Sequence, residues 1–289
     1  MSAPLPGLDG LAPMPLAEVN ERARLVSRVC RTYLVPVELV PAVFAGAAAS
    51  FGVLTIGGRN SFRYSSTYMD TPDLRTFHDH RRCRRRRFKV RVRSYVDTGA
   101  RMCEVKTKDG RGGTDKTRID HAGPQDLLVP ESRAFVERTL RRYGLEPPGD
   151  LRPGTVTDYR RTTLVALGGG ERVTLDTGLA GIRGGRTVRM RPDVVLVEVK
   201  TPGGRTPTER RLHEFGVRAT GFSKYTALTA ALEPGLPGNR WHRSVRYCLD
   251  RAPGVAAPRA TTPSGPGAPA APGPGVTVGV SRETSTHPG

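Results

Sequence analysis

The sequence has few cysteines and no long apolar run, and both absences narrow what the chain can be. Its four cysteines, Cys30, Cys83, Cys103 and Cys248, form no Cys-x-x-Cys pair, so we expect free thiols and no structural zinc. No apolar stretch reaches membrane-spanning length, and the N-terminus lacks a basic segment followed by an apolar one. These features predict a cytoplasmic protein.

Aromatic residues and lysines are also scarce. Aromatics make up only 6% of the chain, and no basic segment interleaves several of them as base-stacking surfaces do. The formal net charge of +19 indicates an acidic partner, which could be polyphosphate, a nucleotide, an anionic membrane or nucleic acid. The scarcity of aromatic residues disfavours nucleic acid, which stays an alternative suggested by charge alone. Only six of the 46 basic residues are lysine, at positions 89, 106, 108, 116, 200 and 224, and most lie in predicted strands. A lysine ammonium is a compact charge that suits a phosphate oxygen.

The two ends of the chain lack any hydrophobic periodicity. Residues 251–289 consist largely of Pro, Gly, Ala, Ser and Thr, and residues 1–16 include Pro4, Pro13 and Pro15. Such segments bury too little apolar surface to fold alone, so we expect both to be disordered. Residues 17–250 are long enough for one domain with a sizeable core.

One strand pattern recurs in that domain, with apolar residues on one face and charged residues on the other. In Arg87–Tyr95 the basic residues alternate with Phe and Val. Because side chains alternate across a strand, these cations share one face. Cys103–Lys108 and Val195–Lys200 repeat the pattern. Like charges in one row repel each other, so we infer that this face binds a polyanion.

Two arrangements could use these strands. One is an open antiparallel sheet with its charged face in water. The other is a closed barrel with a charged lumen and helices on its apolar outside. The recurrence of the pattern and several amphipathic helices favour the second arrangement. We therefore predict an α+β fold, an antiparallel eight-stranded β tunnel packed by outer α-helices. Predicted helices include 37–51, one that begins at Thr71-Pro72-Asp73, and 224–232, and Thr206 with Glu209 forms a capping box.

A set of charged residues on these strands is the candidate site. Carboxylates inside a basic wall repel phosphate unless a divalent cation lies between them, and Mg²⁺ or Mn²⁺ binds through one or two carboxylates plus substrate phosphates. The alternative role of each carboxylate is a salt bridge with a neighbouring arginine. Lys224 lies in the first turn of a predicted helix, where an anion would make its position favourable. The set comprises Arg91, Arg93, Lys106, Arg161, Lys200, Glu104, Asp176 and Glu198.

Seven motifs occur in an order that resembles a known family. They are Arg28–Tyr33, Tyr64–Pro72, Lys89–Arg93, Glu104–Lys106, Tyr159–Arg161, Glu198–Lys200 and Ser223–Tyr225. Together they resemble the VTC-type polyphosphate polymerase domain of the triphosphate tunnel, or CYTH-like, enzymes, over roughly residues 24–247. The resemblance implies a tunnel with a basic lumen that binds triphosphate or polyphosphate. It also implies transfer of the γ-phosphoryl of ATP to a growing polyphosphate chain, with Mn²⁺ or Mg²⁺ as cofactor and a separate membrane protein as a further candidate partner.

The resemblance also implies roles for individual residues. Glu198 and Asp176 would hold the metal, and Lys89, Glu104 and Tyr33 would contact substrate. The phosphates would be bound by Arg91, Arg93, Lys106, Arg161, Lys200 and Lys224.

The chain departs from the family pattern in its first strand. Such domains usually carry an acid followed by Lys-Tyr, where this chain has Arg31-Thr32-Tyr33. Thr32 replaces a lysine that would touch phosphate, and Arg31 points to the opposite face of a regular strand. Two alternatives to the polymerase therefore remain: a triphosphate hydrolase of the same fold, and a polyphosphate-binding module with weakened catalysis.

Overall fold

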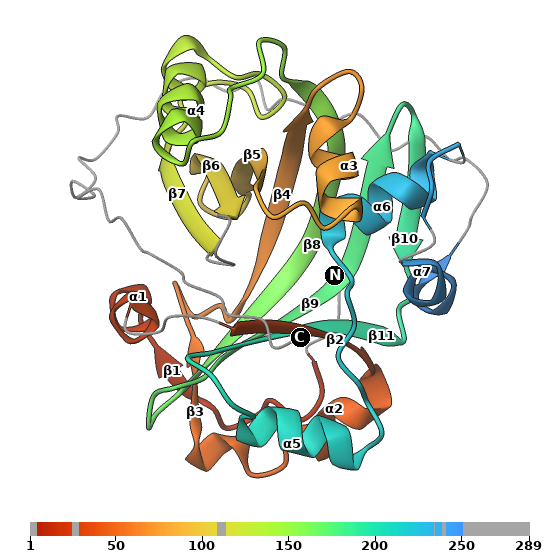
Figure 1. The fold of residues 1–289 in the computed structure, drawn as a ribbon. Coiled ribbons are helices and arrows are strands. Elements are labelled where there is room, and N and C mark those ends of the chain that lie inside the picture. Colours follow the sequence, from red (N-terminus) through yellow and green to blue (C-terminus); the bar gives the residue numbers. More distant parts are fainter. Residues whose placement is uncertain (1–4, 25–28, 109–113, 234, 239–240, 251–289) are drawn as a thin grey trace, which may run out of the picture.

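A 12-stranded sheet dominates the computed structural model, which describes residues 5–24, 29–108, 114–233, 235–238 and 241–250 (Figure 1). The predicted tail 251–289 and Arg28 of the first motif lie outside the described residues. The strands are β1 (Ala12–Met14), β2 (Val29–Pro36), β3 (Phe51–Leu54), β4 (Ser61–Asp70), β5 (Arg87–Tyr95), β6 (Arg101–Lys108), β7 (Thr114–Asp120), β8 (Arg152–Ala166), β9 (Arg172–Arg183), β10 (Arg186–Met190), β11 (Val194–Thr201) and β12 (Leu249–Asp250). The α-helices are α1 (Leu16–Arg24), α2 (Val40–Val43), α3 (Arg75–Arg81), α4 (Pro130–Arg142), α5 (Pro207–Glu214), α6 (Lys224–Leu232) and α7 (His242–Cys248).

Eight of the strands form one antiparallel path, β2-β11-β9-β8-β4-β5-β6-β7. β10 and β12 extend the sheet beyond the second half of β9, and β3 carries the parallel strand β1 beside β8. Among the described residues no ladder joins β2 to β7, the two ends of this path. The α+β class and the antiparallel sheet are confirmed. The predicted strand count of eight is wrong for the whole sheet, and closure into a tunnel stays a prediction.

The outer face of the sheet is apolar and carries helices, as predicted. Val195, Val197 and Val199 of β11 pack with residues of α2 and α5 in one buried cluster. Val90 and Val105 belong to a second cluster that α4 covers. Burial of these alternate side chains fixes the register of the strands, because a slip by one residue would bring the charged face into the core.

Helix α6 lies on the other face, the one that carries the charges. A bulge in β9 contributes to this packing: one extra residue lies between Thr177 and Ala180 opposite β8, and Gly178 has a φ of 59°. Such a bulge switches the face to which the following side chains point. Leu175 before the bulge packs in the outer cluster, whereas Leu179 after it packs in the cluster built around α6.

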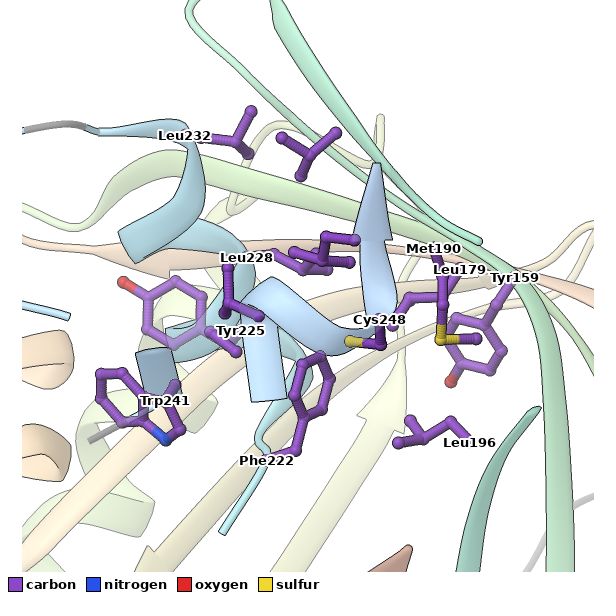
Figure 2. Packing of buried hydrophobic residues seen from close by; sticks show 14 of the residues in the cluster. Tyr159, Leu179, Met190, Leu196, Phe222, Tyr225, Leu228, Leu232, Trp241 and Cys248 are labelled. Carbon is purple, nitrogen blue, oxygen red and sulfur yellow. The ribbon is translucent and has the colours of Figure 1, made fainter. Parts of the chain in front are cut away.

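Figure 2 shows the packing of the buried cluster around α6. Leu228, Leu232 and Trp241 pack there with apolar residues of β8, β9 and β11. A Cβ on Gly181 would lie 2.9 Å from Leu228 Cβ, so glycine permits this close approach of helix and strand. Helix α6 is therefore not one of the helices on the apolar face. It packs on the face that carries the charges and brings its N-terminus to them.

Three local predictions also differ from the structure. The predicted helix 37–51 is a short 3₁₀ turn, α2 and a second 3₁₀ turn, since Pro41 and Gly46 (φ 76°) interrupt it. The segment 1–16, expected to lack structure, contains β1, whose Met14 is buried. Helix α3 begins at Arg75, because Leu74 adopts a left-handed conformation. No helix among the described residues has the length and apolar character needed to span a membrane.

Candidate functional site

The ladders bring the predicted site residues onto one face. Residues directly opposite each other in an antiparallel ladder share a face. Arg91 opposes Glu104 across β5 and β6, and Arg161 opposes Asp176 across β8 and β9. Glu198 of β11 lies beside β9 in the same ladder system. The ladders therefore gather these charges on one face, although Arg91 and Glu198 are 107 residues apart in sequence.

The first group of charges surrounds Glu104. Arg91 Nε donates to a Glu104 oxygen at 2.6 Å, and Lys116 Nζ lies 2.7 Å from the other oxygen. Arg93 Nε is 4.0 Å from the same carboxylate. Burial would raise the pKa of Glu104, but these cations hold it well below its usual range. Burial and the nearby arginines lower the pKa of Lys116 to about 7 although Glu104 opposes the shift.

The second group of charges contains both candidate metal ligands. Arg161 donates two hydrogen bonds to Asp176, at 2.6 and 2.7 Å. Lys224 Nζ lies 2.7 Å from both Asp176 and Glu198. Lys200 Nζ donates to Glu198 at 2.9 Å. Burial would raise the pKa of Glu198, but Lys200, Lys224 and Arg161 hold it well below its usual range. Both carboxylates are therefore ionised at neutral pH.

The N-terminus of α6 is anchored from β4. Tyr225, next to Lys224, donates its hydroxyl hydrogen to the buried carboxylate of Asp70. That carboxylate also accepts from the backbone N–H groups of Thr71, Thr76 and Phe77, at 2.8–3.0 Å. Asp70 thus joins the start of α3 to the start of α6, and this fixes the position of the Lys224 ammonium.

Lys89 and Lys106 are two further cations, and they lie outside the groups around Glu104 and around Asp176 and Glu198. They oppose each other across β5 and β6, and the described residues offer no carboxylate to either in an ion pair. Lys89 Nζ donates to the side chain of Ser223 at 2.9 Å, so Ser223 does not cap α6 with its own hydroxyl. Burial, Lys106 and Arg87 lower the pKa of Lys89 well below its usual value. An anion bound here would raise the pKa of Lys89 again.

Asp176 and Glu198 supply carboxylate oxygens, which are the ligands that hard divalent cations prefer. Within the described ranges, no group of three or more His, Cys, Asp or Glu side chains is arranged as a metal site. Asp176 and Glu198 nevertheless converge on one point, the Lys224 ammonium. Thr174, opposite Glu198 in the ladder, has a buried hydroxyl without a protein partner. Asp176 already accepts both hydrogen bonds from Arg161, so Glu198 is the more available ligand.

Comparison with known proteins agrees with this geometry. The family model of the VTC domain matches residues 27–233, more than half of the chain. The chain belongs to the VTC family. A search of curated proteins found no significant match.

Solved structures similar to this VTC domain are distant in sequence. A protein from Hippeastrum, described as a putative adenylyl cyclase with a dominant triphosphatase activity, is 14% identical, with 74% of this chain and 99% of that chain covered and a TM-score of 0.40. A putative adenylate cyclase from Vibrio parahaemolyticus is 12% identical, with 68% and 95% covered and a TM-score of 0.39. The PH1012 protein of Pyrococcus horikoshii is 14% identical, with 66% and 94% covered and a TM-score of 0.34. Similarity at these TM-scores supports no functional conclusion.

One predicted site residue of the VTC domain lies elsewhere. Tyr33 is buried in the outer cluster and donates its hydroxyl hydrogen to Glu209 of α5 at 3.1 Å. Arg31 pairs with the same carboxylate at 3.0 Å. Alternation along β2 places both on the outer face, so the predicted substrate contact of Tyr33 is wrong. Thr32 faces the charges and opposes Glu198.

Three tyrosines of the VTC domain contact the site arginines but were not among the predicted site residues. Tyr159 accepts from Arg93 at 2.9 Å, and Tyr68 accepts from Arg91 at 3.0 Å. Tyr64 stacks on Tyr159 with ring centroids 5.4 Å apart. These rings hold the guanidinium groups in place by hydrogen bonds and cation–π contacts. The sequence could have indicated two of these tyrosines as site residues, since Tyr64 and Tyr68 share one face of a predicted strand.

Proposed function

We propose that this VTC domain is a metal-dependent polyphosphate polymerase that transfers the γ-phosphoryl of ATP to a growing polyphosphate chain. The observation that supports the proposal is the convergence of Arg161, Lys200 and Lys224 on two carboxylates on a partly enclosed face. Phosphoryl transfer depends on positioning and charge neutralisation more than on a protein nucleophile. A face rich in fixed cations provides both.

The cations act by exchanging carboxylate partners for phosphate. In the free protein Arg91, Arg161 and Lys224 are each paired with a carboxylate. Phosphate oxygens accept the same hydrogen bonds, and the tyrosines keep the guanidinium groups oriented while the partners change. The terminal oxygen of the polyphosphate chain attacks the γ-phosphorus. The bond from that phosphorus to the β–γ bridging oxygen breaks, and ADP leaves with this oxygen.

Glu198, with Asp176 beside it, is the proposed holder of a divalent cation. Mn²⁺ or Mg²⁺ bound there would neutralise charge on the phosphates as the reaction proceeds. Lys224 stands between the two carboxylates, so this lysine moves toward the phosphates when a cation binds. Among the described residues the hydrogen-bond donors to Glu198 are Lys200 and Lys224, and Arg161 Nη2 lies 3.6 Å from the same carboxylate.

A second candidate function is polyphosphate binding with weakened catalysis. Thr32 favours it, because this residue opposes Glu198 and carries no charge. The backbone carbonyl of Thr32 accepts from Thr220 at 2.7 Å, so the strand is held in place at this point. A phosphate near Glu198 would therefore lack one cation that the family pattern supplies.

Incubation of the full chain with ATP and Mn²⁺ separates the candidates. Polyphosphate chains together with ADP support the polymerase, whereas free phosphate without chains indicates a triphosphate hydrolase. Tight polyphosphate binding without turnover indicates the binding module. Glu198→Gln should abolish Mn²⁺-dependent turnover, while Asp193→Asn, at an exposed pair with Arg191, should leave it unchanged. Equal turnover in the Glu198→Gln variant would contradict the proposed metal role.

A further inference from the structure

A run of exposed arginines lies between α3 and β5, outside the site described above. Arg82, Arg84, Arg85 and Arg86 are all exposed. Helix α3 ends just before them: the N–H of Arg84 donates to Asp79 O and the N–H of Cys83 donates to His80 O. Cys83 adopts a left-handed conformation with a φ of 53°. This pattern is that of a Schellman motif, so the backbone that carries the first arginines is defined by hydrogen bonds.

These four arginines have no carboxylate partner in an ion pair among the described residues, whereas some other surface arginines have one. Arg152 pairs with Asp150, and Arg211 pairs with Glu214. The C-terminal end of a helix stabilises cations only within its last turn. The end of α3 can therefore stabilise the charge of Arg82 but not the charges of the later arginines. Arg84, Arg85 and Arg86 lie beyond that turn. Four uncompensated charges in five residues repel each other unless an anion lies among them.

The run continues the cation row of the site. Arg87 begins β5, and Lys89, Arg91 and Arg93 follow on the same face at intervals of about 6.7 Å. Arg87 opposes Lys108 and Lys89 opposes Lys106 across the ladder, so like charges face each other at this end. A chain anion that leaves the site along β5 would therefore pass Lys89 and then the N-terminal end of the strand, where the exposed arginines lie.

We infer that Arg82, Arg84, Arg85 and Arg86 bind the part of a polyphosphate chain that extends beyond the site. The inference rests on the proposed function for the identity of the ligand. The four arginines can recognise a ligand only by its repeated negative charge, because the run contains no aromatic residue on which a base could stack. A triphosphate is too short to occupy both the site and the run. The arginines should therefore discriminate between phosphate chains by length.

The test compares tripolyphosphate and a long polyphosphate chain as ligands of the full chain. In one variant Arg82, Arg84, Arg85 and Arg86 are all replaced by Ser. In a matched control the exposed arginines Arg189, Arg210, Arg243 and Arg246 are replaced by Ser. Both variants lose the same charge from exposed positions, so both should fold as the parent does.

The run variant should bind the long chain at least about tenfold more weakly and tripolyphosphate within about twofold of the parent. The slope of log affinity against log salt for the long chain should fall by about 3, since four phosphate contacts are lost. The control should change neither ligand by more than about twofold. If the run variant and the control lose equal long-chain affinity, or if the run variant weakens both ligands equally, the inference is wrong.

Single-stranded RNA of matched phosphate number provides the remaining comparison. RNA that binds the parent more tightly than polyphosphate, and depends more strongly on the four arginines, would assign the run to nucleic acid and overturn the inference. Failure of the proposed function is seen in a separate assay, because the parent would then form no polyphosphate chains from ATP and Mn²⁺. Tripolyphosphate binding with an unchanged long-chain affinity in the run variant contradicts only the present inference.

Discussion

Replacement of Asp176 by Asn tests whether the carboxylates stabilise the free protein by neutralising its own site. Asp176 is fully buried, accepts two hydrogen bonds from Arg161 and lies 2.7 Å from Lys224. The amide keeps the volume of the side chain and removes its charge. Glu198 would then be the nearest carboxylate for both cations, and Arg161 Nη2 is 3.6 Å from it.

The expected loss of stability is large. Removal of one partner from a buried ion pair costs about 3–5 kcal/mol, because it leaves an uncompensated buried charge. For a domain of this size, such a loss lowers the melting temperature by roughly 6–20 °C. Asp193→Asn is the matched control, since Asp193 also pairs bidentately with an arginine but is solvent-exposed. That control should melt close to the parent.

The difference in stability between the parent and Asp176→Asn should depend on pH in a predictable direction. Burial would raise the pKa of Asp176, but Arg161 and Lys224 hold it below its ordinary value of 3.8. A carboxylate with a lowered pKa in the folded state stabilises the protein above that ordinary value and loses the contribution as the pH falls through the folded pKa. The difference in stability between parent and variant should therefore be complete at neutral pH and shrink in acid.

Tripolyphosphate should partly rescue the variant. The anion supplies negative charge to Arg161 and Lys224 without displacing a carboxylate, so the variant should bind it more tightly than the parent does. A ligand at 100 times its Kd stabilises the folded state by about 2.7 kcal/mol. Denaturant unfolding with and without tripolyphosphate measures this effect. A variant as stable as the parent, or one that gains no more from the ligand, would refute the reasoning.

Three further predictions follow from the same geometry. Asp70→Asn should lower the free energy of unfolding by about 2–4 kcal/mol, measured in denaturant, because several buried N–H groups and the Tyr225 hydroxyl lose a charged acceptor. Tripolyphosphate binding at about pH 8 should be accompanied by proton uptake, since a bound anion raises the pKa of Lys116 from about 7. Calorimetry in buffers of different ionisation enthalpy measures this uptake, which should be smaller in the Lys116→Met variant. Thr32→Lys should raise tripolyphosphate affinity about tenfold in a titration, with Thr32→Gln as the neutral control, because one charged hydrogen bond is worth about 1.5 kcal/mol or more.

Alternation in the sequence was sufficient to predict which charges share a face. Arg91, Lys106, Arg161 and Glu198 all lie on the face opposite the buried valines, as their positions in the predicted strands indicated. The same rule separated Thr32 from Arg31 correctly. It would also have excluded Tyr33, which was assigned to the site by family resemblance against the alternation of its own strand.

The position of α6 could not be predicted from local pattern. Leu179 would fall on the outer face if β9 were regular, because Leu175 does. A single inserted residue at the Gly178 bulge reverses this, and one glycine in a strand is too weak a signal to identify a bulge. The reversal adds Leu179 to the cluster around α6, beside Leu196 of the regular strand β11.

The ion pairs explain why the site carries carboxylates at all. Arg161 and Lys224 are each less than 12% exposed, and cations so buried need a counter-charge whenever phosphate is absent. Asp176 and Glu198 supply it, and the tyrosines preserve the geometry of the guanidinium groups. The carboxylates therefore stabilise the free protein and would weaken the proposed binding of phosphate at the same time. A divalent cation would relieve this competition by giving Glu198 a new partner while Lys224 turns to the substrate.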